Sequence, residues 1–331
     1  MTRPLVRRAL PCALLAAAGA AASPAQATEG GESFYLLGSG GPETAVAPPV
    51  EGVFFDNTFY YYSGNTEAAR EFVLGGKVVA GLDAEVVADF ATVLWVPSTD
   101  VAGGTLSLGA VLPVGRPSVN VDAVLTGPGG GQVAIAREDS AFVIGDPAVT
   151  AMLSWNAGGN WHVQAAAMVN IPVGEYREDQ LANLAFHRWA TDLSLATSWH
   201  DPKAGWDVSA KAGFTFNGTN DYTDYDTGTE FHLEGSVERI FSPQFSAGLQ
   251  AYHFQQVSGD SGPGAVLGPY KGRVTAIGAT AAHTFELGKT AVTARVRVFE
   301  EFGAKNRLDG TSVFVSLTLP LWMNLPTGAG G

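Results

Sequence analysis

Residues 205–217 read GWDVSAKAGFTFN, a stretch in which apolar and polar side chains alternate. One parity holds Trp206, Val208, Ala210, Ala212, Phe214 and Phe216, and the other holds Asp207, Ser209, Lys211, Gly213 and Thr215. Successive side chains of a β-strand point to opposite faces of the sheet. The stretch therefore predicts a strand with one apolar face and one polar face.

The same alternation recurs along most of the chain and predicts twelve strands. They are expected at residues 51–62, 83–96, 104–124, 146–155, 161–173, 186–199, 206–216, 229–240, 244–256, 272–286, 290–302 and 311–322. The connections alternate between short turns, such as 156–160, and long loops, such as 126–145. This arrangement is typical of a transmembrane antiparallel up-and-down β-barrel, with short periplasmic turns and long external loops. Residues 104–124 include two prolines, which cannot donate into a ladder, but their parity favours a single strand.

The first residues have the pattern of an export signal. Three arginines among the first eight residues precede an apolar run over 9–22, and Ala25-Gln26-Ala27 matches the small-x-small cleavage pattern. We expect residues 1–27 to be a signal peptide that is removed after Ala27. The only cysteine, Cys12, lies within it, so no disulfide framework and no thiol chemistry are expected in the exported chain.

Beyond the signal, no stretch is apolar for long enough to predict a transmembrane helix. A membrane-inserted chain would therefore have to cross with closed strands, which satisfy their own backbone hydrogen bonds. Such an exported barrel is expected in the outer membrane of a Gram-negative bacterium. The net charge of −13 argues against a nucleic-acid partner, because phosphates require a basic surface. A periplasmic β-sandwich is the alternative fold.

The tryptophans favour the barrel over the sandwich. Six of the seven lie beside short turns or near the C-terminus: Trp95, Trp155, Trp161, Trp199, Trp206 and Trp322. An indole combines an apolar body with one hydrogen-bond donor, which suits the headgroup level of a membrane. These six residues predict an aromatic belt at the periplasmic side of the membrane.

The sequence divides around the predicted barrel, which covers residues 51–322. Residues 28–50 are rich in Gly, Pro and small side chains, with a bulky cluster only at residues 35–37. They could form a periplasmic tail or a plug inside the lumen, and the sequence leaves both open. Residues 323–331 are expected to form a C-terminal tail.

Charged residues on the polar parity are the candidate lumen-lining residues. A lipid-facing Arg or Lys at the membrane midplane costs roughly 2 to 4 kcal/mol, so the charged parity is expected to point inward. The predicted set is Asp83, Glu85, Asp89, Asp192, Asp207, Lys211, His232, Glu234, Glu238, Arg295, Arg297 and Glu301. These side chains could form an interior salt-bridge network that stiffens a small barrel, or they could line a narrow polar conduit or ligand site.

Three stretches resemble known catalytic or ligand-binding motifs but lack the features that those motifs require. Gly259-Asp260-Ser261-Gly262-Pro263 resembles the nucleophile loop of chymotrypsin-like proteases, yet His283 follows the serine instead of preceding it. The acidic stretch 220–230 lacks the spacing of a calcium loop and is expected to be a solvated loop. The glycines at 127–131 lack the ending of a phosphate loop. No zinc spacing joins the six histidines, and no cofactor or metal is expected.

Four blocks of sequence resemble the family of meta-pathway phenol-degradation proteins. They are residues 181–184 with Trp189, 205–234, 255–274 and 296–321, and the similarity extends over about residues 50–321. The resemblance implies outer-membrane barrels that occur with aromatic-degradation genes and are likened to fatty-acid and toluene channels. It implies no functional residues. One departure is that Trp322 is followed by further residues instead of ending the chain, which concerns the barrel-assembly signal.

The resemblance and the glycine-rich long loops favour an outer-membrane channel or transporter for small hydrophobic or aromatic compounds. The expected partners are outer-membrane lipids, the barrel-assembly machinery and the substrate, and the oligomeric state is left open. Two other classes are alternatives. One is a barrel-based lipid hydrolase, for which Ser261 and His253 would be the nucleophile and base. The other is a structural barrel without transport.

Overall fold

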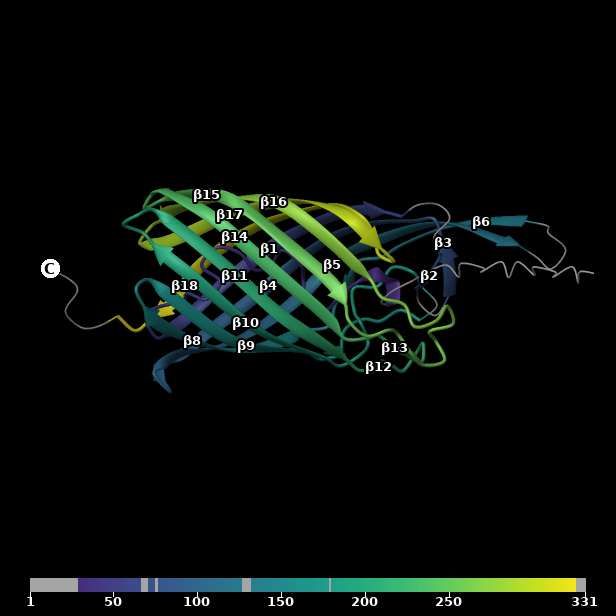
Figure 1. The fold of residues 1–331 in the computed structure, drawn as a ribbon, viewed down its shortest axis with the longest axis horizontal. Helices are drawn as coiled ribbons and strands as arrows, with labels where there is room; N and C mark the ends of the chain where they lie inside the picture. Colours follow the sequence, from purple (N-terminus) through teal and green to yellow (C-terminus); the bar gives the residue numbers. More distant parts are fainter. Residues whose placement is uncertain (1–28, 67–70, 75–76, 127–131, 179, 326–331) are drawn as a thin grey trace, which may run out of the picture.

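The computed structural model of the protein is a closed antiparallel β-barrel of 12 strands (Figure 1). It describes residues 29–66, 71–74, 77–126, 132–178 and 180–325, so the predicted signal peptide and the glycines at 127–131 lie outside the described residues. The barrel strands are β1 (Gly52–Asn65), β4 (Leu82–Val101), β5 (Gly104–Thr126), β8 (Ala148–Gly158), β9 (Trp161–Asn170), β10 (Ala190–Asp201), β11 (Trp206–Asn217), β14 (Glu230–Ser242), β15 (Phe245–Gln256), β16 (Arg273–Leu287), β17 (Thr290–Lys305) and β18 (Asp309–Met323).

Pairing between the first and last of these strands closes the barrel. β1 pairs with β4 on one side and with β18 on the other, from Gly52 opposite Met323 to Asn65 opposite Asp309. Closure leaves the ring of twelve strands without an open edge, as a membrane-spanning sheet requires. The observed strands match the twelve predicted from the alternation, with ends that differ by a few residues. Among the described residues, no helix has the length and apolar character needed to span a membrane.

The two ends of the barrel differ. Tight connections join β4 to β5, β8 to β9, β10 to β11, β14 to β15 and β16 to β17 at one end, where the C-terminus also lies. We call this the short-turn end. The opposite end carries the long connections, on the right of Figure 1, and we call it the long-loop end. The short loops contain residues with positive φ, such as Ala102, Gly159 and Asn160, which lets the chain reverse within a few residues.

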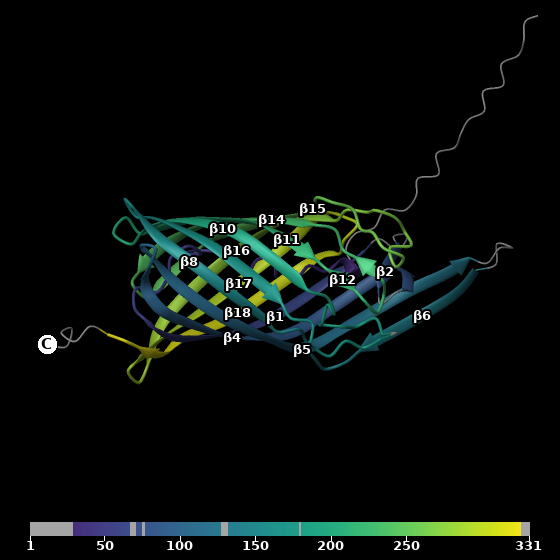
Figure 2. The same cartoon turned by 90° about the horizontal axis from the view of Figure 1, so that it is seen from below.

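Some of the long connections contain short strands that the sequence did not predict. A hairpin of β2 (Glu71–Leu74) and β3 (Lys77–Ala80) occupies the first, and β12 (Thr219–Asn220) pairs with β13 (Tyr225–Asp226) in another. The predicted loop at 126–145 contains β6 (Gln132–Ser140) and β7 (Val143–Ile144), both paired with β5. The β5–β6 hairpin projects beyond the barrel wall in both views (Figure 2).

β5 is one continuous strand that changes partner along its length. Its first half pairs with β8 up to Val111, and its second half pairs with β6 from Ser118. Pro113 and Pro117 lie in the interval between these two ladders. Proline has no backbone N–H to donate, so it fits best where the pairing changes. The prediction of a single strand is confirmed, and the prolines mark its exchange of partners.

Burial along the strands distinguishes inward from outward side chains. In β14, His232, Glu234 and Glu238 are buried, whereas Leu233 and Val237 between them are exposed. The paired residues of adjacent antiparallel strands share a face, so the register carries this assignment around the barrel. The inner face of β10, β11 and β14 is therefore largely polar and their outer face apolar, as in outer-membrane barrels.

Residues 29–50 lie inside the barrel, and we call them the lumen segment. The segment begins with η1, a 3-10 helix (Glu29–Gly31), at the long-loop end, where Asn220 donates to Glu29 at 2.9 Å. It then runs along the lumen and reaches β1 at the short-turn end, and Figure 1 shows its purple trace within the barrel. The sequence left a tail and a plug open; the segment contacts inward residues of the wall, and its action as a plug stays a prediction.

Candidate functional site: the lumen and its chambers

The part of the lumen segment that is nearer the long-loop end is held by side chains of β11, β14 and β17. The Gly38 N–H donates to Glu234 Oε1 at 2.8 Å. The ring of Tyr35 stacks on that of His232, with 3.6 Å between centroids, and the Lys211 ammonium lies 4.8 Å from the centre of the Tyr35 ring. These contacts fix a turn of the lumen segment against the polar wall through hydrogen-bond, stacking and cation–π interactions.

The part of the lumen segment that is nearer the short-turn end is held through its backbone. The Glu43 N–H donates to Asp207 Oδ1 and to Ser209 Oγ, both at 3.1 Å, and the Ala45 N–H donates to Ser198 Oγ at 3.0 Å. A chain without regular structure leaves its own N–H groups unpaired, so the wall must supply the acceptors. The inward polar residues of β10 and β11 serve that purpose.

The structure places nine of the twelve predicted lumen residues on the inward parity: Asp192, Asp207, Lys211, His232, Glu234, Glu238, Arg295, Arg297 and Glu301. Several pair with one another. The Arg295 guanidinium lies 2.5 Å from Glu238, and His232 Nε2 lies 2.9 Å from Asp192. Others contact the lumen segment. Some members therefore form an interior network and others hold the lumen segment, while the alternative of a polar conduit or ligand site stays a prediction.

The other three predicted residues, Asp83, Glu85 and Asp89, point outward, which corrects the prediction. Asp89 pairs across the sheet with Phe59, whose side chain is exposed, and accepts a 2.5 Å hydrogen bond from Asn57 Nδ2 on the same outer face. The inward parity of β4 holds instead the small and apolar side chains of Ala84, Val86, Ala88 and Phe90. The usual rule of charges inside fails on this strand because its inner face borders apolar cavities.

The six tryptophans of the predicted belt all lie toward the short-turn end. Trp95, Trp161, Trp206 and Trp322 are between 40% and 55% exposed, and Trp155 and Trp199 are half-buried. Trp161 and Trp199 are directly paired across β9 and β10. This is the position that an interfacial belt requires, because the rings face outward at one level of the wall.

An apolar cavity of about 450 Å³ lies between the lumen segment and the wall. We call it the inner chamber. Toward the short-turn end it extends to Phe54 and Leu94, a cross-strand pair that lies next to the pair containing Trp95. Its sides include Met152 and Met168. Aromatic and aliphatic side chains make up most of its lining. Its size falls within the range of roughly 300–1,000 Å³ that is usual for small-molecule sites.

Two smaller cavities continue from the inner chamber toward the long-loop end. The middle chamber, about 150 Å³, shares Phe34, Phe90 and Phe186 with the inner chamber. The outer chamber, about 40 Å³, shares Phe186 and Glu32 with the middle one and is bordered by the segment before β10. The three chambers thus lie one after another beside the lumen segment, from the long-loop end to the level of the tryptophan belt.

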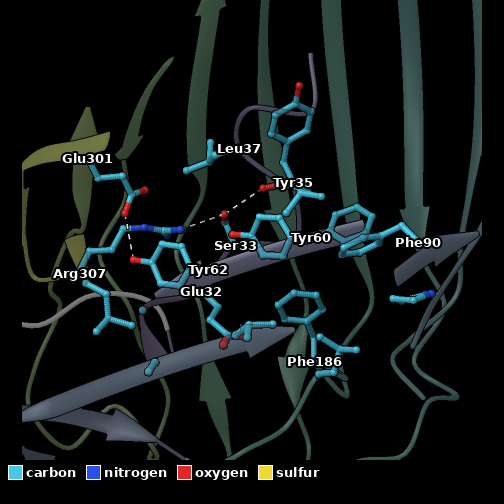
Figure 3. A pocket seen from close by; sticks show the side chains of 18 of the residues that line it. Glu32, Ser33, Tyr35, Leu37, Tyr60, Tyr62, Phe90, Phe186, Glu301 and Arg307 are labelled. Atoms are coloured by element: carbon cyan, nitrogen blue, oxygen red, sulfur yellow. Dashed lines mark hydrogen bonds between the residues drawn. The ribbon is translucent and has the colours of Figure 1, made fainter. Parts of the chain in front are cut away.

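Figure 3 shows the middle chamber, in which aromatic rings lie beside a small polar corner. The rings of Tyr60 and Phe90 form an edge-on pair at 6.1 Å, and Phe186 lies on the opposite side. At the polar corner, Tyr62 donates to Glu301 at 2.9 Å, and Arg307 donates to Ser33 at 3.5 Å.

Two carboxyl groups of the lumen segment, at the long-loop end, are shielded from water. Burial raises the pKa of Glu32 to about 7, although Arg307 and Arg188 nearby oppose this shift. The pKa of Glu29 is also raised, again chiefly by burial. A considerable fraction of Glu32 is therefore neutral near pH 7.

The residues that resembled a catalytic motif in the sequence have structural roles in the barrel and its loops. Ser261 forms a bridge with Asp226 in the external loops, and His253 bonds to Thr275 at 2.8 Å on the outer face of β15. The hydrogen bonds of the described residues do not join Ser261 to a histidine. Asp260, from the same motif, accepts hydrogen bonds from Tyr225 at 2.6 Å and from the Gly228 N–H at 2.9 Å. Burial raises the pKa of Asp260 despite these donors. No metal-ligand cluster occurs among the described residues.

Comparison with known proteins assigns the chain to a family. The sequence pattern of the family described as "Putative MetA-pathway of phenol degradation" matches residues 71–317, most of the chain. The chain belongs to this family. A comparison with curated protein sequences gives no match.

Among solved structures, the fold of this family member is similar to that of the COG4313 outer membrane channel from Pseudomonas putida F1. The TM-score is 0.66 at 19% identity, over 85% of this chain and 99% of the other. Weaker similarity links it to the translocator domain of the autotransporter NalP from Neisseria meningitidis (TM-score 0.45, 11% identity, 81% of this chain and 88% of the other) and to a Pseudomonas aeruginosa FadL homologue (0.40, 11%, 90% and 97%). The first similarity establishes an outer-membrane barrel fold.

Sequence reasoning did not find the chambers. Their lining comes from the inward parity of β1, β4, β5 and β8 together with residues 34–36 of the lumen segment. One signal was available in β4. Asp89 and Trp95 have the same parity, so the predicted outward position of Trp95 already implied an outward Asp89.

Proposed function

We propose that the protein is a passive channel of the outer membrane that admits small hydrophobic or aromatic compounds. The observation that carries this proposal is the series of three chambers beside the lumen segment, with an inner chamber of about 450 Å³ lined mainly by apolar side chains. A water-filled pore for polar solutes would be lined by polar groups instead. The family name, which refers to phenol degradation, agrees with an aromatic cargo.

Apolar chambers in a membrane barrel provide a physical route for such compounds. An apolar molecule gains roughly 25 cal/mol for each Å² of surface that it removes from water, which favours its entry from the mouth. The small middle and outer chambers, together with the lumen segment, limit the route to small molecules. Passage down a concentration gradient needs no catalytic group, and the proposal assigns none. Export through a signal peptide at residues 1–27 would deliver the chain to this membrane.

The proposal is tested by uptake of labelled toluene at limiting concentration in cells with and without the gene. Two neighbouring residues of β9 give a matched pair of variants. Met168 lines the inner chamber, whereas Val169 lies on the opposite parity. We expect Met168→Trp to slow uptake by filling the chamber, and Val169→Trp to leave it unchanged. Equal uptake with and without the gene would remove the transport claim, and equal uptake by both variants would remove the chamber from the route.

A further inference from the structure

Three arginines line the three chambers, one in each. Arg188 borders the outer chamber, Arg307 the middle one and Arg297 the inner one. Among the described residues, none of the three has a carboxylate oxygen within 4 Å of its guanidinium, whereas Arg295 in the same lumen is paired with Glu238. Each also has one buried nitrogen for which the described residues provide no acceptor: Arg188 Nη2, Arg307 Nη1 and Arg297 Nε.

Three carboxylates that line the middle or inner chamber, Asp56, Glu301 and Asp146, are in the opposite condition. Both oxygens of Asp56 accept hydrogen bonds, from Thr58 at 2.8 Å and Thr318 at 2.6 Å. Both oxygens of Glu301 accept from tyrosines, Tyr62 at 2.9 Å and Tyr252 at 2.7 Å. Asp146, which borders the inner chamber, accepts from Asn170 and from three backbone N–H groups. These three acids therefore have their hydrogen-bond partners, whereas the three arginines are short of acceptors.

Arg297 shows this most clearly because it lies in the largest chamber. Its Nη1 makes only long contacts, at 3.4 Å to the Gly38 carbonyl and 3.3 Å to the Ser39 carbonyl, and its guanidinium lies 5.8 Å from the centre of the Phe314 ring. A guanidinium in a largely apolar cavity is costly unless an anion with good geometry pairs with it. A planar carboxylate matches the guanidinium fork better than other small groups do.

We propose that the chambers select compounds that carry a carboxylate on an apolar body, such as aromatic acids with a single ring, and that Arg297 is the specificity-determining residue. The inference rests on the proposed function, since it names the substrate class of the same route. The apolar lining would hold the ring while Arg297 binds the carboxylate. Arg307 and Arg188 would hold the carboxylate in turn on its way from the mouth.

The test is isothermal titration calorimetry on the full exported chain in lipid nanodiscs. The ligands are benzoate and benzamide, which have the same ring and nearly the same size but differ in charge. A charge-assisted hydrogen bond favours benzoate by about tenfold or more in affinity. We expect Arg297→Gln to abolish this preference and Arg297→Lys, which keeps the charge but not the fork, to retain part of it.

Arg116 provides the matched control, because it lies on the outward face of β5 and donates to Ser140 at 3.1 Å. Arg116→Gln should keep the full preference for benzoate. Equal affinity of the wild type for both ligands would overturn the inference, as would a preference that survives Arg297→Gln. If that variant fails to fold, Arg307→Gln takes its place and is expected to weaken the preference. Toluene uptake that depends on the protein without any preference for benzoate would overturn this inference alone and leave the proposed function intact.

Discussion

At the level of single residues, substitutions of two exposed leucines can test whether the outer face of the barrel contacts lipid. Leu195 and Leu287 are both 69% exposed, but Leu195 lies in the middle of β10 and Leu287 at the short-turn end of β16. Arginine on the lipid face costs about 2–4 kcal/mol at the midplane and about 0–1 kcal/mol near the interface. We therefore expect Leu195→Arg to lower the free energy of unfolding in lipid vesicles far more than Leu287→Arg. Equal losses would show that these residues do not differ in membrane depth.

Residue parity also explains how far the sequence could predict the site. In β14 every second residue from Glu230 to Glu238 is charged or polar and buried, so Glu234 and Glu238 were placed from the alternation alone. In β4 the acids are outward and the inner face is apolar, because that face borders a chamber instead of a polar lumen. Alternation reports which residues share a face, but only the position of a cavity decides which face is the polar one. Arg307 and Phe186 lie in connections without a period, so no pattern placed them in the chambers.

At the scale of elements, the lumen segment depends on close backbone approach. A side chain at Gly40 would collide with Glu234, the residue that accepts the hydrogen bond from the Gly38 N–H. Overpacking of this kind costs roughly 1–3 kcal/mol. Gly40→Val should therefore loosen the segment and raise the single-channel conductance in a planar bilayer. Ser39→Val is the control, because Ser39 is exposed within the lumen. Conductance that is unchanged by Gly40→Val would show that the segment does not obstruct ion flow.

Residues 171–189 form a second element that depends on one side chain. They connect β9 to β10 where both strands are short, and Asp146 accepts from the N–H groups of Gly174 at 2.8 Å, Phe186 at 2.8 Å and His187 at 3.1 Å. Asp146→Ala leaves three donors without an acceptor and is expected to destabilise this element by about 3 kcal/mol or more. Hydrogen exchange across these residues should accelerate, while the barrel strands stay protected. Protection equal to that of the wild type would contradict the anchoring role of Asp146.

At the scale of the whole molecule, the twelve strands were predictable but the content of the lumen was not. A two-residue period repeated along the chain is enough to predict a barrel, because only closed strands satisfy their backbone in a membrane. Residues 29–50 have no period, so their course through the lumen depends on long-range contacts such as those of Tyr35 with His232 and of Ala45 with Ser198. The same contacts leave one side of the lumen free, and that space contains the chambers.

The methionines allow the most direct test that apolar compounds occupy these chambers. Apart from Met1, the chain has Met152 and Met168, which line the inner chamber, and Met323, which is exposed at the end of β18. With carbon-13 labelled methionine methyl groups, titration of toluene into the protein in nanodiscs can be followed by NMR spectroscopy. We expect ring-current shifts at Met152 and Met168 that saturate, with the Met323 signal unchanged. Shifts confined to Met323, or shifts that grow equally at all three without saturation, would contradict it.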